Sequence, residues 1–182
     1  MRIVAGTHRS RLIKSPKDDS IRPTSDKVRL AVFNMLQSRD AVVDAIVLDA
    51  FCGSGALGLE ALSQGAAHVT FWDKSPASLS LTRENIAALG FAGQCDSALV
   101  NSATVKENPK PEEQFTLVFL DPPYHKGLVE KAVQKLIAGR WTNDQTLYVI
   151  ETAASEKIDL SLRILQEKTY GETKVKIAFL LT

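Results

Sequence analysis

The tetrapeptide Asp121-Pro122-Pro123-Tyr124 carries the most informative side chains in this sequence. Proline lacks a backbone N–H and has a fixed φ, so two in succession form a stiff bend. That bend offers only acceptors, the Asp121 carboxylate and the Pro122 carbonyl, and it is therefore complementary to an NH₂ group. Holding both N–H bonds would point the nitrogen lone pair at an electrophile, while the Tyr124 ring stacks on the base. The base must then be unpaired or flipped out of a duplex. A plain strand-ending turn with an exposed tyrosine is the simpler alternative.

A glycine-rich turn, Gly53-Ser54-Gly55-Ala56-Leu57-Gly58, lies between an expected strand and an expected helix. Such glycines permit a tight turn and let a ligand approach the backbone at a helix N-terminus. Asp73 follows Gly53 by 20 residues, where a carboxylate can accept hydrogen bonds from ribose hydroxyls. Asp49 precedes the first glycine by four residues, where it can accept from an ammonium group but would oppose a pyrophosphate. The pattern favours S-adenosylmethionine over a nicotinamide dinucleotide, and a turn without ligand is the alternative.

These motifs lie in a region of alternating strands and helices that begins near residue 45. We expect strands at 46–48, 68–72, 98–100, 116–120 and 146–151, helices from the glycine turn to 65, at 76–89 and at 127–138, and a closing hairpin at 161–168 and 174–181. Strand–helix alternation predicts a mostly parallel sheet covered on both faces. Ligands of such sheets bind beyond the carboxyl ends of the strands. Because Asp49, Asp73 and Asp121 each end a strand, we expect all three at one edge.

The first 40 residues form a basic extension. They hold nine basic and four acidic groups, a net of +5, whereas the rest holds thirteen and seventeen, a net of −4. We expect an extended or hairpin arm over 1–23, then an amphipathic helix from a Thr24 or Ser25 cap to about Ser38. A basic arm on an acidic body favours a nucleic-acid partner, because phosphates supply most non-specific affinity. A solvated terminus is the alternative.

Composition excludes several classes of protein. A length of 182 residues, with 45% hydrophobic residues, predicts one domain with a core that needs no disulfide or metal. Two cysteines exclude a disulfide framework and a multi-cysteine zinc site, and the three histidines lack metal-ligand spacing. No stretch approaches the ~18 apolar residues of a membrane span, and the N-terminus lacks a signal-peptide core. We expect a cytoplasmic protein that binds neither metal nor membrane.

Together the motifs resemble a known family. The run from Asp49 to Leu62 and the Asp-Pro-Pro-Tyr bend are similar to those of S-adenosylmethionine-dependent amino-methyltransferases. The segment Arg22-Pro23-Thr24-Ser25-Asp26-Lys27-Val28-Arg29 and the opening Met1-Arg2-Ile3-Val4-Ala5-Gly6 narrow the resemblance to the bacterial 16S rRNA (guanine-N2) methyltransferase D family. It spans nearly the whole chain, including a Tyr170-Gly171-Glu172-Thr173 turn. It implies a Rossmann-like, seven-stranded methyltransferase sheet, mostly parallel with a C-terminal antiparallel hairpin. One domain over 1–182 would comprise the basic extension at 1–40 and the catalytic core at 41–182.

The resemblance also implies roles for the matching residues. Such enzymes methylate the exocyclic N2 of one guanine in 16S rRNA, and the catalytic residues would be Asp121, Pro122, Pro123 and Tyr124. The methionine end of the cofactor would contact Asp49, Phe51, Gly53, Ser54 and Gly55. Asp73 would hold the ribose, although the family more often has Glu there. Where the family has an Asp-Ala pair for the adenine, this chain has Asn101-Ser102-Ala103. We therefore expect an amide or the Ser102 hydroxyl to replace the carboxylate, with the Ala103 N–H facing the adenine.

The expected partner is 16S rRNA within an assembled small-subunit particle, bound by a monomer. The RNA contacts implied are Arg9, Arg11, Arg22 and Arg29. Three alternatives stay open: the same chemistry on a DNA adenine or a protein glutamine, a nicotinamide oxidoreductase, and an inert RNA-binding protein on a methyltransferase scaffold.

Overall fold

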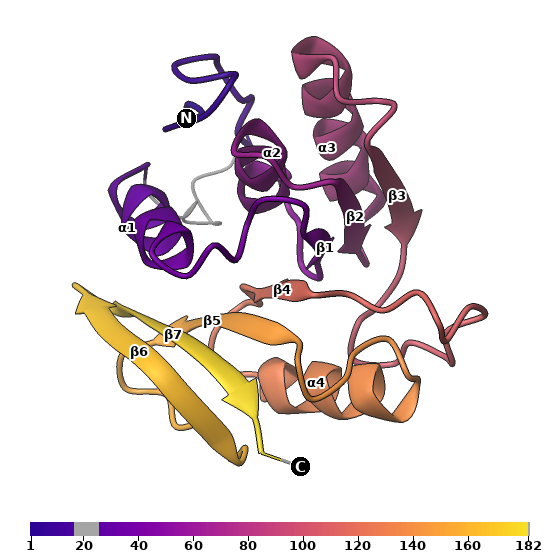
Figure 1. The fold of residues 1–182 in the computed structure, drawn as a ribbon, viewed down its shortest axis with the longest axis vertical. Coiled ribbons are helices and arrows are strands. Elements are labelled where there is room, and N and C mark those ends of the chain that lie inside the picture. The colour runs from indigo at the N-terminus through magenta and orange to yellow at the C-terminus, as the bar shows by residue number, and fades with distance from the viewer. Residues whose placement is uncertain (17–25, 182) are drawn as a thin grey trace.

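The computed structural model describes residues 1–16 and 26–181, and these contain one seven-stranded sheet (Figure 1). The strands are β1 (Ile46–Asp49), β2 (His68–Asp73), β3 (Cys95–Leu99), β4 (Leu117–Leu120), β5 (Leu147–Ala153), β6 (Leu162–Tyr170) and β7 (Thr173–Leu180). Their order is β3-β2-β1-β4-β5-β7-β6. The first five are parallel, whereas β7 runs antiparallel to both β5 and β6. The predicted Rossmann-like sheet with an antiparallel C-terminal hairpin is confirmed.

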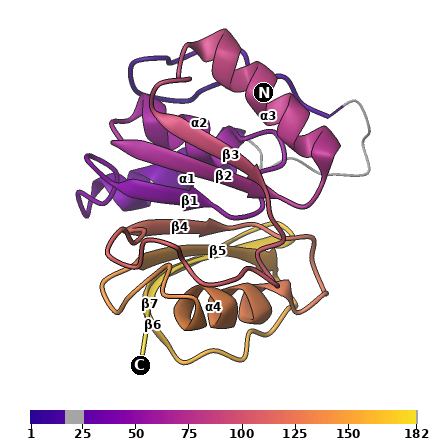
Figure 2. The same ribbon diagram turned by 90° about the vertical axis from the view of Figure 1, so that its right-hand side faces the viewer.

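Four helices cover the two faces of the sheet: α1 (Asp26–Gln37), α2 (Ala56–Ser63), α3 (Pro76–Leu89) and α4 (Leu128–Ala138). Figures 1 and 2 show α1, α2 and α3 on one face and α4 on the other. Successive strand residues point to opposite faces. Val47 and Phe119 therefore pack with the three-helix layer, whereas Leu48 and Leu120 pack with α4. None of the helices in the described part of the chain is long and apolar enough to cross a membrane.

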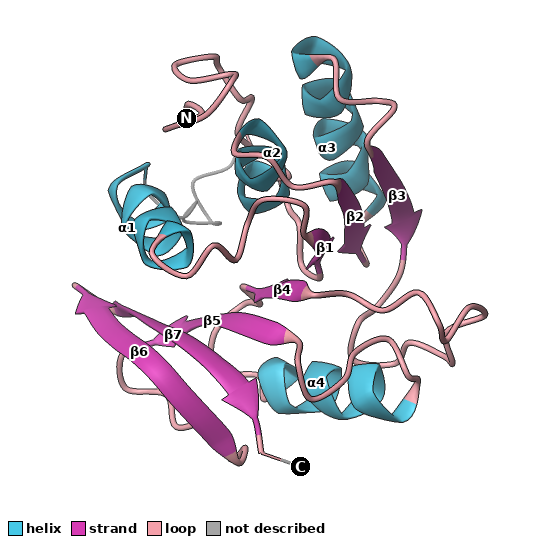
Figure 3. Ribbon diagram, viewed as in Figure 1, coloured by secondary structure: helices cyan, strands magenta, loops and turns pink. Residues whose placement is uncertain are grey.

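The crossover from β3 to β4, residues 100–116, is a loop without a helix (Figure 3). It covers the α4 side of β2, where the Trp72 and Trp141 rings meet edge to face at 4.8 Å between centroids. β3 begins at Cys95, three residues before the predicted strand. The prediction missed this start because β3 is an edge strand, paired only with β2, and its Asp96 and Ser97 can face water. Such a strand has no continuous apolar signal.

The N-terminal arm is a short hairpin docked on the three-helix layer. Arg2 and Leu12 form an antiparallel bridge, and the hairpin buries Ile3 and Ile13. The backbone N–H groups of residues 4 and 5 donate to the two carboxylate oxygens of Glu60, at 2.8 and 2.9 Å. The hairpin alternative is therefore confirmed for residues 1–16, whereas the predicted Thr24 or Ser25 cap of α1 lies outside the described residues.

Candidate active site

The three carboxylates predicted to share one edge of the sheet do so. In the register of the sheet, Asp49 lies opposite Phe71 of β2 and Phe119 of β4. Asp73 follows Phe71 by two residues, and Asp121 follows Phe119 by two residues. They therefore flank Asp49 at the carboxyl ends of the strands. The strand order reverses at β1, and parallel sheets form a ligand-binding crevice at such a point. Both neighbouring carboxylates also raise the pKa of Asp49, as expected of charges in one site.

Asp49 is the most enclosed of the three carboxylates. Its side chain accepts a hydrogen bond of 3.0 Å from the Gly58 N–H, and the residue is 2% exposed. Burial raises the pKa of Asp49 to about 7; the bond from Gly58 opposes this rise, and the charges of Asp121 and Asp73 add to it. A positively charged ligand would offset the cost of ionising this carboxyl. The site is therefore complementary to a cation.

The glycine loop is supported from behind by polar side chains of α3. The Thr82 hydroxyl donates to the Gly53 carbonyl and the Asn85 amide donates to the Ser54 carbonyl, each at 2.9 Å. Gly53 has a φ of +54°, and a Cβ there would meet no atom within 4 Å, so the backbone is open to a ligand at that point. Ser54 and Gly55 are more buried than Gly53, and their contacts with a cofactor stay a prediction.

Sequence analysis missed Thr82 and Asn85. The available signal was their position on the buried face of α3, which they share with Leu79 and Ile86. A polar side chain on an otherwise apolar helix face needs a hydrogen-bond partner, and here the partner is the backbone of the glycine loop.

Asp73 links the glycine loop to the start of α3. One carboxylate oxygen accepts from the Gly53 N–H at 3.0 Å, and the other accepts from the Ser75 N–H at 2.8 Å. Each oxygen keeps a second lone pair for a further donor. The carboxylate can thus organise the loop and still accept from a hydroxyl, so the ribose contact stays a prediction.

The turn at Asn101–Ala103 corrects one predicted contact. Ser102 is 1% exposed, and its hydroxyl donates to the Ala50 carbonyl at 2.6 Å. The structure opposes the hydroxyl alternative of that prediction, because the group is enclosed and its proton is engaged by the backbone, whereas the amide alternative, Asn101, stays a prediction. The Ala103 N–H donates to the Asn101 Oδ1 at 3.1 Å, so it faces its own turn. Of the polar side chains of this turn, that of Asn101 is the exposed one.

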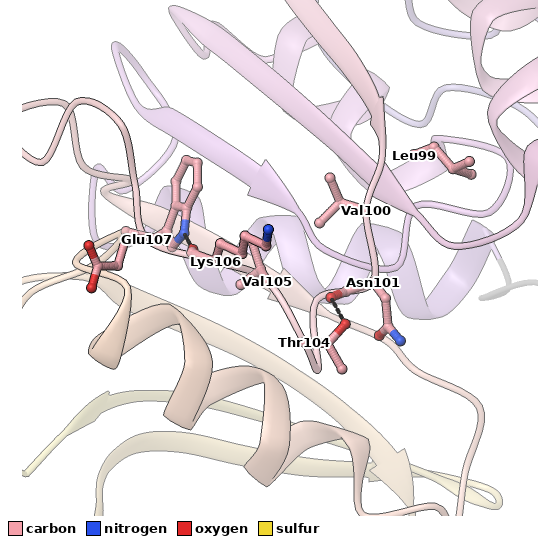
Figure 4. A pocket seen from close by; sticks show the side chains of 8 residues that line it. Leu99, Val100, Asn101, Thr104, Val105, Lys106 and Glu107 are labelled. Atoms are coloured by element: carbon pink, nitrogen blue, oxygen red, sulfur yellow. Dashed lines mark hydrogen bonds between the residues drawn. The ribbon is translucent and has the colours of Figure 1, made fainter.

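A pocket of about 300 Å³ adjoins the same turn (Figure 4). Leu99 and Val100 at the end of β3, Val105 of the crossover loop and Trp141 supply apolar walls, and Asn101 supplies a polar side chain. This combination can receive a flat ring with polar edges. Phe51, also predicted to contact the cofactor, is half-buried against the core on the α4 side of the sheet.

The Asp-Pro-Pro-Tyr bend follows β4 directly. Asp121 and Tyr124 are half-buried, Pro122 is buried and Pro123 is exposed. The Tyr124 hydroxyl lies 3.1 Å from a carboxylate oxygen of Glu151. Burial, followed by the charges of Glu151 and Asp121, raises the pKa of Tyr124, so the phenol stays protonated. The bend thus combines a carboxylate and a neutral aromatic ring in one site.

Of the predicted RNA contacts, the structure contradicts Arg29 and does not describe Arg22. Arg29 is 0% exposed, and its guanidinium pairs with Glu60 at 3.3 Å and with Asp26 at 2.8 Å. The prediction of a substrate-facing Arg29 is wrong, because the side chain is enclosed between α1, α2 and the arm, where it binds carboxylates. Arg22 lies outside the described residues.

Arg9 and Arg11 are exposed but distant from the carboxylates. Arg11 donates to the Ala88 carbonyl at 3.0 Å, in the last turn of α3, and the neighbouring Thr7 contacts Ser63, the last residue of α2. Helices that return from the carboxyl edge of a parallel sheet end at its opposite edge. Any RNA contact of the arm tip therefore lies away from the bend.

The side chains present fit S-adenosylmethionine. This cofactor carries an ammonium and a sulfonium, and the structure supplies a buried carboxyl whose pKa is raised to about 7 beside two further carboxylates. Asp73 retains acceptors for a ribose diol, and the pocket beside Asn101 has apolar walls. The described side chains therefore match the cationic groups, the ribose and the adenine of this cofactor.

Comparisons with known proteins show the family and the fold of this chain. Residues 1–179 match the profile of a family described as Conserved hypothetical protein 95. The chain is 33% identical to the Ribosomal RNA small subunit methyltransferase D of Escherichia coli, over 97% of this chain and 88% of the relative. It is 32% identical to the protein of the same name from Haemophilus influenzae, over 94% and 89%. The solved structure of the Escherichia coli protein yhhF, provisionally named a methyltransferase, superposes on this chain with a TM-score of 0.84 at 32% identity. The match covers 99% of this chain and 97% of that one.

Proposed function

The chain belongs to the Conserved hypothetical protein 95 family of methyltransferases similar to ribosomal RNA small subunit methyltransferase D, and on this premise we propose that it methylates a guanine of small-subunit rRNA. The acceptor would be the exocyclic N2, and the methyl donor S-adenosylmethionine. The observation that carries the proposal is the Asp-Pro-Pro-Tyr bend beside the Asp49 and Asp73 carboxylates, at the carboxyl ends of the adjacent strands β1 and β4.

The donor supplies a methyl group on a positively charged sulfur. Asp49 would balance the charge of its ammonium, Gly53 would let it approach the backbone, and Asp73 would accept from its ribose. The pocket beside Asn101 would receive the adenine. The Asn101 amide would then replace the carboxylate, and the buried Ser102 would support this turn through its bond to the Ala50 carbonyl.

The bend would bind the acceptor amine. The Asp121 carboxylate and the Pro122 carbonyl would each accept one N–H of the guanine NH₂, and Tyr124 would stack on the ring. In such a transfer the N2 lone pair would form the nitrogen–methyl bond as the sulfur–methyl bond breaks, the bond's electron pair would stay on the sulfur, and the N2 proton would leave to water. Alignment of the nitrogen with the methyl carbon, at ~3 Å contact, would supply most of the acceleration.

An assembled small-subunit particle is the proposed form of the substrate, acted on by a monomer in the cytoplasm. Arg9 and Arg11 would contact RNA at the edge of the sheet opposite the bend, which requires a partner large enough to span both. Folded ribosomal RNA within a particle has such dimensions, whereas a single flipped nucleotide does not. The salt dependence of binding would report these phosphate contacts.

The decisive test combines mass-spectrometric mapping of rRNA with a single substitution. Particles from a strain lacking the gene should lack one N2-methylguanine, and the purified protein should restore it. Asp121→Ala should lower turnover by about 100-fold or more, with S-adenosylhomocysteine binding close to normal. Asp144→Ala, an exposed carboxylate in the turn before β5, serves as the matched control. Transfer to DNA or protein but not to particles would instead support another amino acceptor, and near wild-type methylation by Asp121→Ala would refute the role of the bend.

A further inference from the structure

The Tyr124 side chain is anchored at its far end by two residues outside the bend. Its hydroxyl lies 3.1 Å from the Glu151 Oε1, at the carboxyl end of β5, and 2.9 Å from the Thr173 Oγ1, the first residue of β7. A phenol has one proton, so if it donates to the carboxylate, the Thr173 hydroxyl donates to the phenol. Glu151 is 6% exposed, whereas Tyr124 and Thr173 are half-buried, so the carboxylate end of this network is the part most shielded from water.

Thr173 is itself held in place by the sheet. It pairs with Ala153 of β5 and with Tyr170 of β6, and the Ala154 N–H donates to the Glu172 carbonyl at 2.7 Å. The turn of the C-terminal hairpin is therefore fixed to β5 beside the bend. A residue 49 positions later in the chain thus reaches the aromatic ring of the predicted catalytic tetrapeptide.

We propose that Glu151 and Thr173 are positioning residues, which hold the Tyr124 ring in the orientation that stacks on the acceptor base. The inference rests on the proposed function and extends it to the C-terminal hairpin. Two consecutive prolines restrict the backbone before the ring, and the two hydrogen bonds restrict its tip. A ring held at both ends loses little conformational freedom when a base binds, so more of the stacking energy contributes to affinity.

The proposal separates base positioning from cofactor binding. Glu151 and Thr173 are not among the residues that line the pocket beside Asn101, and the hydrogen bonds described above join them to Tyr124 rather than to the glycine loop. Loosening the ring should therefore raise the KM for the RNA substrate and leave the affinity for S-adenosylhomocysteine unchanged. A purely structural role of the hairpin would affect both measurements through misfolded protein.

The experiment compares Thr173→Val and Tyr124→Phe with wild type, using small-subunit particles from a strain lacking the gene. We expect Thr173→Val to raise the KM for particles about tenfold, the factor that one hydrogen bond supports. Tyr124→Phe should raise the KM at least as much, because it removes the bonds to both Thr173 and Glu151, and the change in kcat should be smaller in both variants. The double variant should resemble Tyr124→Phe alone, because that substitution already removes the bond to Thr173. Thr152→Val is the matched control: this buried hydroxyl of β5 makes no hydrogen bond within the described residues, and its loss should leave the KM unchanged.

Glu151 is tested by a graded pair. Glu151→Gln keeps an oxygen acceptor for the phenol and should be milder than Glu151→Ala. Circular dichroism and S-adenosylhomocysteine titration of every variant would establish that it is folded. An active wild type whose Thr173→Val and Tyr124→Phe variants keep the normal KM would overturn this inference alone. A wild type that transfers no methyl group to particles would overturn the proposed function, and the inference with it.

Discussion

The raised pKa of Asp49 predicts that ionising this carboxyl lowers the stability of the ligand-free protein. A bound cation would offset that cost. Its pKa rises from 3.8 to about 7, mainly by burial. A tenfold change in proton affinity is about 1.4 kcal/mol, so the ionised group costs the folded state about 4 kcal/mol at most. Because the pKa of Asp49 is higher in the folded protein than in the unfolded chain, the protonated side chain makes its full contribution to the free energy of unfolding below about pH 4. That contribution is lost as the pH rises to about 7.

Asp49→Asn removes the charge and keeps the shape. Below pH 4 the variant and wild type should have similar free energies of unfolding. The variant should become the more stable protein as the pH rises, reaching a plateau above pH 7. Because the amide copies the neutral carboxyl, the gain at the plateau should approach the roughly 4 kcal/mol cost of ionising Asp49 in the folded state.

Urea denaturation of both proteins between pH 4 and pH 8, without ligand, measures this difference. Asp144→Asn is the control, since that exposed carboxylate should give a flat difference across the range. Titration with S-adenosylhomocysteine should show the opposite trend: weaker binding by Asp49→Asn, and wild-type affinity that falls as the pH drops below 7. A difference in unfolding free energy that does not change with pH would refute the reasoning.

Two further substitutions test the packing that positions the site. Glu60→Gln should lower the free energy of unfolding by about 3 kcal/mol, because it leaves the buried guanidinium of Arg29 without this carboxylate. Its control, Glu84→Gln, changes an exposed carboxylate and should cost under ~0.5 kcal/mol. Equal effects of the two substitutions in urea melts would contradict the role of burial. Gly58→Ala should cost about 1–3 kcal/mol by the same measurement, since its Cβ would lie 2.3 Å from the Phe71 ring. A stabilised Gly58→Ala protein would show that α2 packs less closely on β2 than the structure indicates.

Local sequence signals predicted most of the elements correctly. Continuous apolar runs such as 116–120 mark central strands, because a parallel strand buried on both faces needs apolar residues throughout. The helix at 76–89 is bounded by the Ser75 cap and by Gly90, whose φ is +81°, and both signals are local. Edge strand β3 was placed three residues late, because the polar Asp96 and Ser97 interrupt its apolar pattern near its start.

The errors concern charged and polar side chains whose environment is set by distant segments. Arg29 lies on a helix that is basic in sequence, yet it is buried because Glu60, 31 residues away, meets it in the core. The Ser102 hydroxyl is turned inward by the Ala50 carbonyl, 52 residues away. Such pairings arise from chain crossings, and no spacing within either segment predicts them.

By itself, the sequence determined the alternation of strands and helices, the acidic strand ends, the glycine turn and the acceptor-only bend, because backbone preferences and hydrophobic period act over a few residues. Only the tertiary structure decided which charges meet. It placed the carboxylates close enough to raise the pKa of Asp49, held the Tyr124 ring through Glu151 and Thr173, and directed the basic arm to the opposite edge. Electrostatic and hydrogen-bond energies depend on distance and burial, and these are properties of the packed chain.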